Sequence, residues 1–282
     1  MIIWIASYPK SGNTWLRALL SSYYYSEKGL FEKKLLNYTG QFPEKSHFKY
    51  FNYDQTIVTE TSKYWIKAQK IINEKKQIRF FKTHNFFGQI NGNSFTDKNN
   101  SLGCIYIIRD PRNVITSLKN HYELNYNEAL NFMMSEKKYL YDYHKTNDYS
   151  DFQFISSWEK NYQSWKMQNE IPVKIIRYED LIEKTFATFE EVLDFINSIT
   201  KNNDLINKTK LKNAIKSTEF NKLKKIENTE GFDESVLSHN KKDKINFFHL
   251  GPANDWNNLL PEELKIKLNN SLKNNLLEFN YC

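Results

Sequence analysis

Four short apolar runs stand out along the chain, at residues 2–6, 78–82, 104–108 and 173–176. Each is four or five residues long, which is close to the usual length of a β-strand. Their apolar side chains are nearly continuous, and this pattern favours strands of a sheet that is covered on both faces. We therefore predict four buried strands.

Helical spacing of apolar residues follows three of these runs. It begins at residue 14, 111 and 180 in turn, and the last of the three patterns extends to residue 197. Asp110 and Pro111 are typical of a helix N-cap and first helical position. A further pattern over 261–279 repeats leucine at every fourth position. Strands that alternate with helices predict right-handed crossovers and a parallel sheet.

The chain shows no internal repeat and no obvious linker, so we expect one domain over residues 1–282. Four stretches without a regular pattern interrupt it, and we interpret them as lids or pocket walls. They are residues 27–62, 85–102, 123–151 and 224–248.

Composition narrows the class of protein. Aromatic residues make up 16% of the chain, which argues against long disordered regions. No apolar run approaches the ~20 residues that span a bilayer. The two cysteines, Cys104 and Cys282, lie far apart, so a disulfide framework is not expected and a reducing, cytoplasmic setting fits. The net charge of +7 suggests an anionic partner, although abundant lysine alone would also produce it.

The first candidate motif lies between the first predicted strand and its helix. Residues 7–15 read Ser-Tyr-Pro-Lys-Ser-Gly-Asn-Thr-Trp. The amides of a helix N-terminus bind anions, and Lys10 with nearby hydroxyls adds charge and donors. Gly12 allows the backbone to approach a phosphate closely. The order of lysine and glycine differs from a Walker A loop. We predict a phosphate-binding loop; an ordinary polar turn is the alternative.

A second candidate motif follows the third predicted strand. Residues 106–117 read Tyr-Ile-Ile-Arg-Asp-Pro-Arg-Asn-Val-Ile-Thr-Ser. Arg109 falls at the carboxyl end of a strand, where α/β proteins bind ligands, and Ser117 follows about two helical turns later. Arginine can bind a phosphate through two hydrogen bonds. A capped helix beside a surface arginine is the alternative.

These motifs together resemble the sulfotransferases that use 3′-phosphoadenosine 5′-phosphosulfate (PAPS). Residues 8–15 resemble the family's 5′-phosphosulfate loop, with Asn13 as the departure, and residues 109–117 resemble its 3′-phosphate element. Three further segments, 82–84, 177–181 and 217–223, also match the family's pattern. The resemblance implies an α/β, P-loop-like three-layer fold with a central parallel sheet flanked by helices.

One segment departs from the family pattern. The family carries Arg-Lys-Gly before Gly-Asp-Trp, whereas this chain has His249 and Leu250 before Gly251. Two positive charges are therefore missing from the expected 3′-phosphate clamp. Either a nearby lysine compensates or the affinity for the donor is reduced. The candidate lysines are Lys241, Lys242 and Lys244.

The resemblance implies a site for PAPS and for its product, 3′-phosphoadenosine 5′-phosphate (PAP). Lys10, Thr14 and the loop amides would bind the 5′-phosphate, and Arg109 with Ser117 would bind the 3′-phosphate. Trp15 and Phe220 would stack on adenine, with Tyr178 and Thr218 at its edge. The remaining donor-binding positions are Ser11, Gly12, Asn13, His249 and Gly251.

The same resemblance assigns catalytic roles to Lys10, Lys82 and His84. Lys10 would stabilise the leaving oxygen, and Lys82 would contact the sulfonate. His84 would take the proton of the acceptor, a task that suits a side chain titrating near neutrality. We see no metal-ligand spacing, and none is required if lysines supply the positive charge.

The acceptor expected is a small molecule with a hydroxyl or amine group, and the sequence leaves its identity and the oligomeric state open. Six aromatic residues are candidates for its pocket: Tyr23, Tyr24, Phe86, Phe87, Tyr122 and Tyr126. Three alternatives remain: a kinase that uses ATP, a nucleotide-binding module without catalysis, and a basic nucleic-acid binder. The chain lacks the Walker A lysine of the kinases and the signatures of nucleic-acid binders, and we expect neither nucleic acid nor membrane as a partner.

Overall fold

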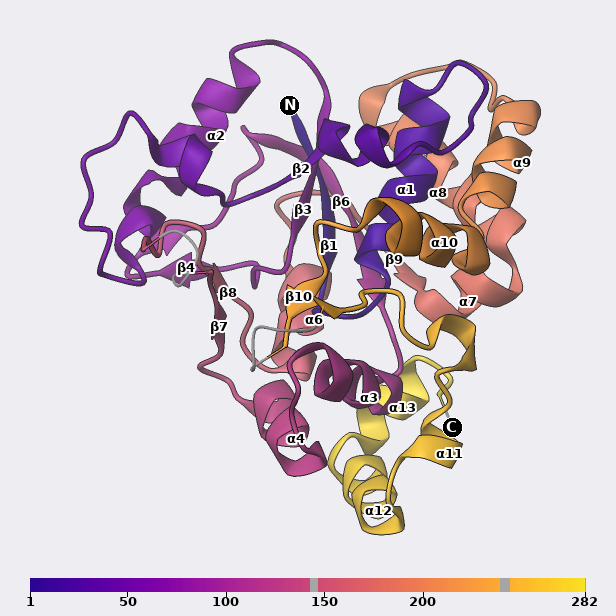
Figure 1. Cartoon of the computed structure of the whole chain (residues 1–282). Coiled ribbons are helices and arrows are strands. Elements are labelled where there is room, and N and C mark those ends of the chain that lie inside the picture. Colours follow the sequence, from indigo (N-terminus) through magenta and orange to yellow (C-terminus); the bar gives the residue numbers. More distant parts are fainter. Residues whose placement is uncertain (143–146, 239–243, 282) are drawn as a thin grey trace.

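Five parallel strands form the central sheet (Figure 1), in the order β2-β3-β1-β6-β9. The computed structural model describes residues 1–142, 147–238 and 244–281. The strands are β1 (Ile2–Ser7), β2 (Thr39–Gln41), β3 (Arg79–Thr83), β6 (Ser101–Ile108) and β9 (Val173–Arg177). The four predicted strands and their parallel arrangement are confirmed. The edge strand β2 was not predicted.

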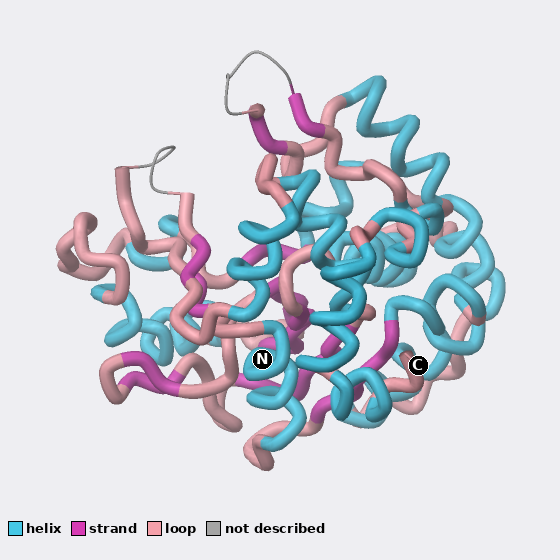
Figure 2. Tube along the Cα trace, turned by 90° about the horizontal axis from the view of Figure 1, so that it is seen from below, coloured by secondary structure: helices cyan, strands magenta, loops and turns pink. Residues whose placement is uncertain are grey.

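Helices cover both faces of the sheet (Figure 2), as the predicted three-layer α/β fold requires. Alternate residues of β1 enter opposite layers: Ile3 and Ile5 pack with one group of helices, and Trp4 packs with the other. The first group is α1 (Asn13–Tyr25), α7 (Tyr178–Glu183), α8 (Thr185–Thr200) and α9 (Lys208–Ser217). The second is α2 (Trp65–Asn73), α3 (Pro111–His121), α4 (Tyr126–Met134), α6 (Trp158–Met167), α12 (Glu262–Ser271) and α13 (Lys273–Glu278).

Two helices that we expected to be continuous are broken. The expected helix at 180–197 is divided into α7 and α8 by Lys184, whose ψ of 42° leaves the helical region. Phe186, near the start of α8, is 36% exposed. The expected helix at 261–279 breaks at Leu272. Its four leucines are nonetheless buried: Leu264, Leu268, Leu272 and Leu276.

The stretches without a regular apolar pattern contain short helices and strands. Asn125 and Glu128 form a capping box at the start of α4. The small hairpin strands are β4 (Gln89–Ile90), β5 (Asn93–Ser94), β7 (Tyr139–Leu140), β8 (Gln153–Phe154), β10 (Val236–Leu237) and β11 (Lys244–Ile245). The other helical elements are α10 (Phe220–Glu230), α11 (Trp256–Leu259), η1 (Lys33–Tyr38), η2 (Lys45–Phe48), η3 (Glu60–Tyr64) and η4 (Gly251–Ala253).

Two further observations concern the cysteines and the lengths of the helices. Cys104 is fully buried in the sheet, and Cys282 lies outside the described residues. Among the helices that are described, none is long and apolar enough to cross a membrane.

Candidate active site

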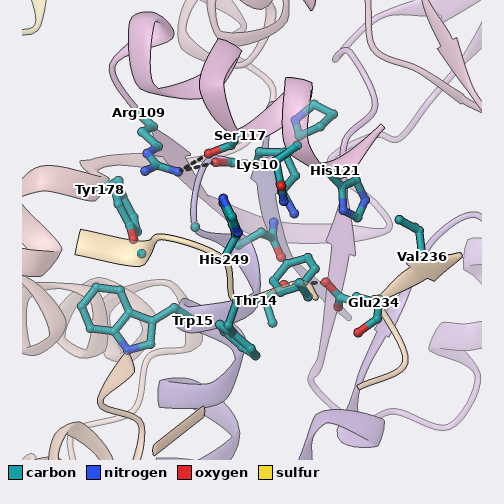
Figure 3. A pocket seen from close by; sticks show the side chains of 18 of the residues that line it. Lys10, Thr14, Trp15, Arg109, Ser117, His121, Tyr178, Glu234, Val236 and His249 are labelled. Carbon is teal, nitrogen blue, oxygen red and sulfur yellow. Dashed lines mark hydrogen bonds between the residues drawn. The ribbon is translucent and has the colours of Figure 1, made fainter. Parts of the chain in front are cut away.

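The carboxyl ends of β1, β3 and β6 meet at a cavity of about 650 Å³ (Figure 3). Parallel α/β sheets bind ligands at this edge. The loop after β1 contributes Lys10, β3 contributes Lys82 and is followed by His84, and Arg109 follows β6. The topology therefore brings together four residues that are separated by as many as 99 positions.

The loop after β1 presents an open helix N-terminus to the cavity. Gly12 has a φ of 102° and provides no side-chain cap for α1. A Cβ at this position would overlap the ring of Tyr178, so only glycine fits both the conformation and the contact. The Asn13 amide donates to the Ile5 carbonyl at 2.8 Å and ties the loop to β1. The first turn of α1 is thus free of any competing cap.

Two partly buried lysines give the cavity positive charge. The Lys10 ammonium lies 3.8 Å from the centre of the Phe247 ring. Burial lowers the pKa of Lys10 to about 7, and Lys82 and Arg109 add to the decrease while Glu234 opposes it. Burial also lowers the pKa of Lys82. An anion that enters the cavity would stabilise the charged form of both side chains.

Arg109 and Ser117 lie together on another side of the cavity. The Arg109 guanidinium donates to the Lys10 carbonyl at 3.0 Å and to the Ser117 hydroxyl at 3.2 Å. It also lies 4.4 Å from the centre of the Tyr178 ring. Asn254 donates to the Ser117 hydroxyl at 3.1 Å. The predicted partners Arg109 and Ser117 are therefore in direct contact.

The partners of His84 define which ring nitrogen is protonated. Its Nδ1 lies 2.7 Å from the Ser7 carbonyl oxygen. A carbonyl only accepts hydrogen bonds, so this partner assigns the proton to Nδ1 and leaves Nε2 with a free lone pair. Burial and the nearby Lys82 lower the pKa of His84 to about 3. Our expectation of titration near neutrality was therefore wrong, because the imidazole is buried beside a cation.

The backbone of His84 is held on both sides. Its N–H donates to the Gln153 side chain at 2.7 Å, and the Asn161 amide donates to its carbonyl at 2.9 Å. Tyr106 donates to Asn161 at 2.7 Å. The backbone that carries the imidazole is thus held by Gln153 and Asn161, and Asn161 is itself held by Tyr106 of β6.

Most of the predicted site residues line this one cavity. They are Lys10, Gly12, Asn13, Thr14, Trp15, Lys82, His84, Arg109, Ser117, Tyr178, Phe220, His249 and Gly251. Ser11 and Thr218 do not line it. Ser11 is buried, and its hydroxyl has no partner among the described residues. The Thr218 hydroxyl donates to the Ala214 carbonyl at 2.8 Å.

Most of the six aromatic residues predicted for the acceptor pocket do not line the cavity. Tyr122 lines the cavity, whereas Tyr23 and Tyr24 pack in the core beside Phe189 and Phe80. No residue of the stretch 85–102, which is described throughout, lines the cavity. The positions that do line it instead are Leu140, Tyr141, Asp142, Asp151, Phe247 and Phe248.

Comparison with known proteins identifies the family. The family model described as "Sulfotransferase domain" matches residues 2–280. The chain belongs to the sulfotransferase family. This match confirms the resemblance and the enzyme class that the motifs indicated.

Relatives and solved structures agree with this assignment. The sulfotransferase is 24% identical to Cytosolic sulfotransferase 13 of Arabidopsis thaliana, over 97% of this chain and 76% of that protein. It is 23% identical to Sulfotransferase 1A1 of Rattus norvegicus, over 90% and 77%. The structure of mouse sulfotransferase SULT7A1 complexed with PAP is similar, with a TM-score of 0.58, 18% identity, and coverage of 97% and 83%. These structural values establish a shared fold.

Four residues of the sulfotransferase site escaped the sequence analysis. Glu234 and His121 line the cavity, and Arg17 contacts Glu234 from behind it. Lys224 donates to the His249 carbonyl at 3.1 Å and brings a positive charge to the segment that lacks Arg-Lys. All four lie outside the contiguous motifs, and only the fold shows that they lie close to the site.

The lysines proposed to compensate for the missing charges are placed less favourably. Lys244 begins β11, is exposed, and does not line the cavity. Lys241 and Lys242 lie outside the described residues.

Proposed function

We propose that this sulfotransferase moves a sulfuryl group from PAPS to a hydroxyl or amine of a small-molecule acceptor. The observation that carries the proposal is the meeting of Lys10, Lys82 and His84 in one cavity, beside an uncapped helix N-terminus. Two cations and free amides suit a 5′-phosphosulfate, and an adjacent neutral imidazole suits removal of a proton.

An unsatisfied polar atom supports the fit of the nucleotide. The Arg109 Nε is buried without a partner among the described residues, and such a group is costly unless a ligand or water satisfies it. Arg109 lines the cavity and contacts Ser117, where the 3′-phosphate is expected. Bound PAPS would supply the activated sulfuryl group.

The proposed transfer is in line. His84 Nε2 takes the proton from the acceptor oxygen as that oxygen forms a bond to sulfur. The bond between sulfur and the bridging oxygen breaks, and Lys10 stabilises the negative charge that develops on this oxygen. Lys82 holds the sulfonate oxygens. The negative charge brought by the donor raises the pKa of His84 from its low value in the free protein and makes it a better base.

Titration calorimetry with PAP tests the donor site, with AMP and ATP as comparisons. We expect PAP to bind tightly and AMP much more weakly, because Arg109 and Ser117 would be unused in the AMP complex. Absence of PAP binding, or a preference for ATP with magnesium, would refute the proposal and favour a kinase.

A His84→Ala variant tests the catalytic role. We expect PAP affinity to stay within about twofold of the wild type, since the ring is not assigned to the nucleotide, while turnover falls by about 10²–10⁴-fold. Unchanged turnover would remove His84 from the mechanism. If the wild type sulfates an acceptor and the variant does not, the protein is an enzyme and not a nucleotide-binding module without catalysis.

The acceptor class and the location are further proposals. The cavity lining includes the aromatic residues Tyr122, Tyr141 and Phe247, which suit an organic molecule. Solved structures of retinol dehydratase, similar in fold with TM-scores of 0.54 and 0.56, contain androsterone or retinol together with PAP. We propose a cytoplasmic location, which the name of Cytosolic sulfotransferase 13 supports.

A further inference from the structure

The carboxylate of Glu234 lines the cavity beside its cations (Figure 3). Its Oε2 accepts a hydrogen bond of 2.6 Å from the Thr14 hydroxyl and lies 3.6 Å from the Lys82 ammonium. Its Oε1 forms an ion pair with Arg17. The carboxylate therefore joins the phosphate loop, β3 and the inner face of α1.

Glu234 is charged despite its surroundings. Burial opposes ionisation, but Lys82 and Arg17 outweigh it and hold the pKa of the carboxyl well below its usual range. The carboxyl is thus ionised at neutral pH. An anion that is already in place acts as a ligand for the cations around it.

The partners of this carboxylate are also the groups proposed to bind the donor. The Thr14 hydroxyl has one hydrogen, so it cannot donate to Glu234 and to a phosphate oxygen at the same time. The Lys82 ammonium has three N–H donors, but a bound sulfonate would share its single positive charge with the carboxylate. Two anions on the same donors also repel each other in a buried site.

The two sides of the ion pair differ in their freedom to move. Arg17 is anchored: its guanidinium donates to the Thr39 hydroxyl at 3.1 Å and to the Thr39 carbonyl at 2.8 Å. Glu234 lies between α10 and β10, outside any helix, and its side chain is 21% exposed. A ligand that competes for the site would therefore move the carboxylate and leave the arginine in place.

We propose that the Glu234 carboxylate occupies the position of a 5′-phosphosulfate oxygen, and that donor binding displaces it. The inference rests on the proposed function. Glu234 is then a determinant of donor affinity, because every donor must first break its contacts with Thr14 and Lys82. The displaced carboxylate exposes the Arg17 guanidinium to the incoming phosphosulfate as an additional cation.

Calorimetric titration of Glu234→Gln with PAP tests this exchange. Glutamine keeps the shape of the side chain and removes its charge. We therefore expect the variant to bind PAP about tenfold more tightly than the wild type does, which is the contribution of one charge-assisted hydrogen bond. The affinity for 3′-AMP, which has no 5′-phosphate, should not change. Glu230→Gln is the matched control, since it makes the same substitution at a nearby exposed side chain that does not line the cavity, and it should match the wild type.

Equal or weaker PAP binding by Glu234→Gln, with normal binding by the wild type, would overturn the exchange and make Glu234 a fixed counter-ion. Absence of PAP binding by the wild type would instead refute the proposed function. A change that is equally large for 3′-AMP would indicate a general structural effect and also overturn the proposal.

Because glutamine leaves Arg17 without its ion pair, a loss of folding stability has to be distinguished from an effect on PAP binding. A second variant that keeps the charge makes this distinction. Glu234→Asp keeps the charge but is shorter by one C–C bond, about 1.5 Å, so it can remain near Arg17 while losing the Thr14 hydroxyl. We expect PAP to bind about threefold more tightly, a smaller gain than one full charge-assisted hydrogen bond. Unchanged or weaker binding by this variant would count against the exchange.

Discussion

The pH dependence of PAP binding gives a quantitative test of the lowered pKa of Lys10. Its pKa in the free protein is about 7, lowered chiefly by burial. Above pH 7 the free side chain is therefore mostly neutral, whereas a bound phosphate favours the ammonium. Binding then takes up a proton, and the affinity for PAP falls as the pH rises.

The size of the effect follows from proton linkage. If the phosphate returns Lys10 to its ordinary pKa of 10.5, affinity falls by up to about tenfold per pH unit above 7. Between pH 7 and pH 9 the total decrease is about 50-fold. The phosphates of PAP contribute little over this range, because their second pKa lies near 6.

Calorimetry at several pH values measures this decrease. Titration at pH 8 in buffers with different ionisation enthalpies should report an uptake of about 0.9 proton per PAP bound. Lys10→Arg is the control, because arginine stays charged, and its profile should be flatter by the Lys10 contribution. A wild-type affinity that changes by less than about threefold between pH 7 and 9, or an equally steep Lys10→Arg profile, would refute the reasoning.

Three further outcomes test other parts of the structure. Arg109→Gln removes the cation beside Ser117, so calorimetry should show PAP binding at least about tenfold weaker, with a smaller loss for AMP; equal losses for both would contradict the 3′-phosphate assignment. Gly12→Ala forces a strained φ against the Tyr178 ring and should lower the free energy of unfolding in urea by at least ~1–2 kcal/mol. Trp165→Ala empties a fully buried position in α6 and should cost ~3–5 kcal/mol in the same assay; a loss below ~1 kcal/mol would show that the site collapses freely.

The strands differed in how well the sequence predicts them. β1 and β6 are apolar at nearly every position, and a run of this kind is recognisable without any tertiary information. β2 has three residues with Gly40 at its centre. It pairs with β3, and Arg17 of α1 binds Thr39. Because its stability comes from these distant partners, local pattern could not reveal it.

The helices show a similar division. Apolar spacing located α7, α8, α12 and α13, but the breaks at Lys184 and Leu272 have no proline or glycine to announce them. Tertiary packing sets the phase of each piece and overrides a continuous stripe. By contrast, α4 carries a local signal, the pair Asn125 and Glu128, that predicts a helix start.

Within the site, contiguous motifs were informative and isolated residues were not. Lys10 and Gly12 belong to a string whose spacing has physical meaning between a strand and a helix. Glu234 is a single acid in a polar stretch, and nothing nearby in the sequence indicates that it reaches Thr14, 220 positions away. The charge balance of the cavity therefore emerges only from the fold.

The position of Tyr178 has a consequence for how the two ends of the nucleotide site act together. The same ring fills the space beside Gly12, lies under the Arg109 guanidinium, and meets Trp15 edge-on at 6.1 Å. Residues that share a partner in this way contribute to binding non-additively. In a double-mutant cycle, the phosphate loop and the arginine should therefore behave as one thermodynamically coupled unit, with Tyr178 as the link between them.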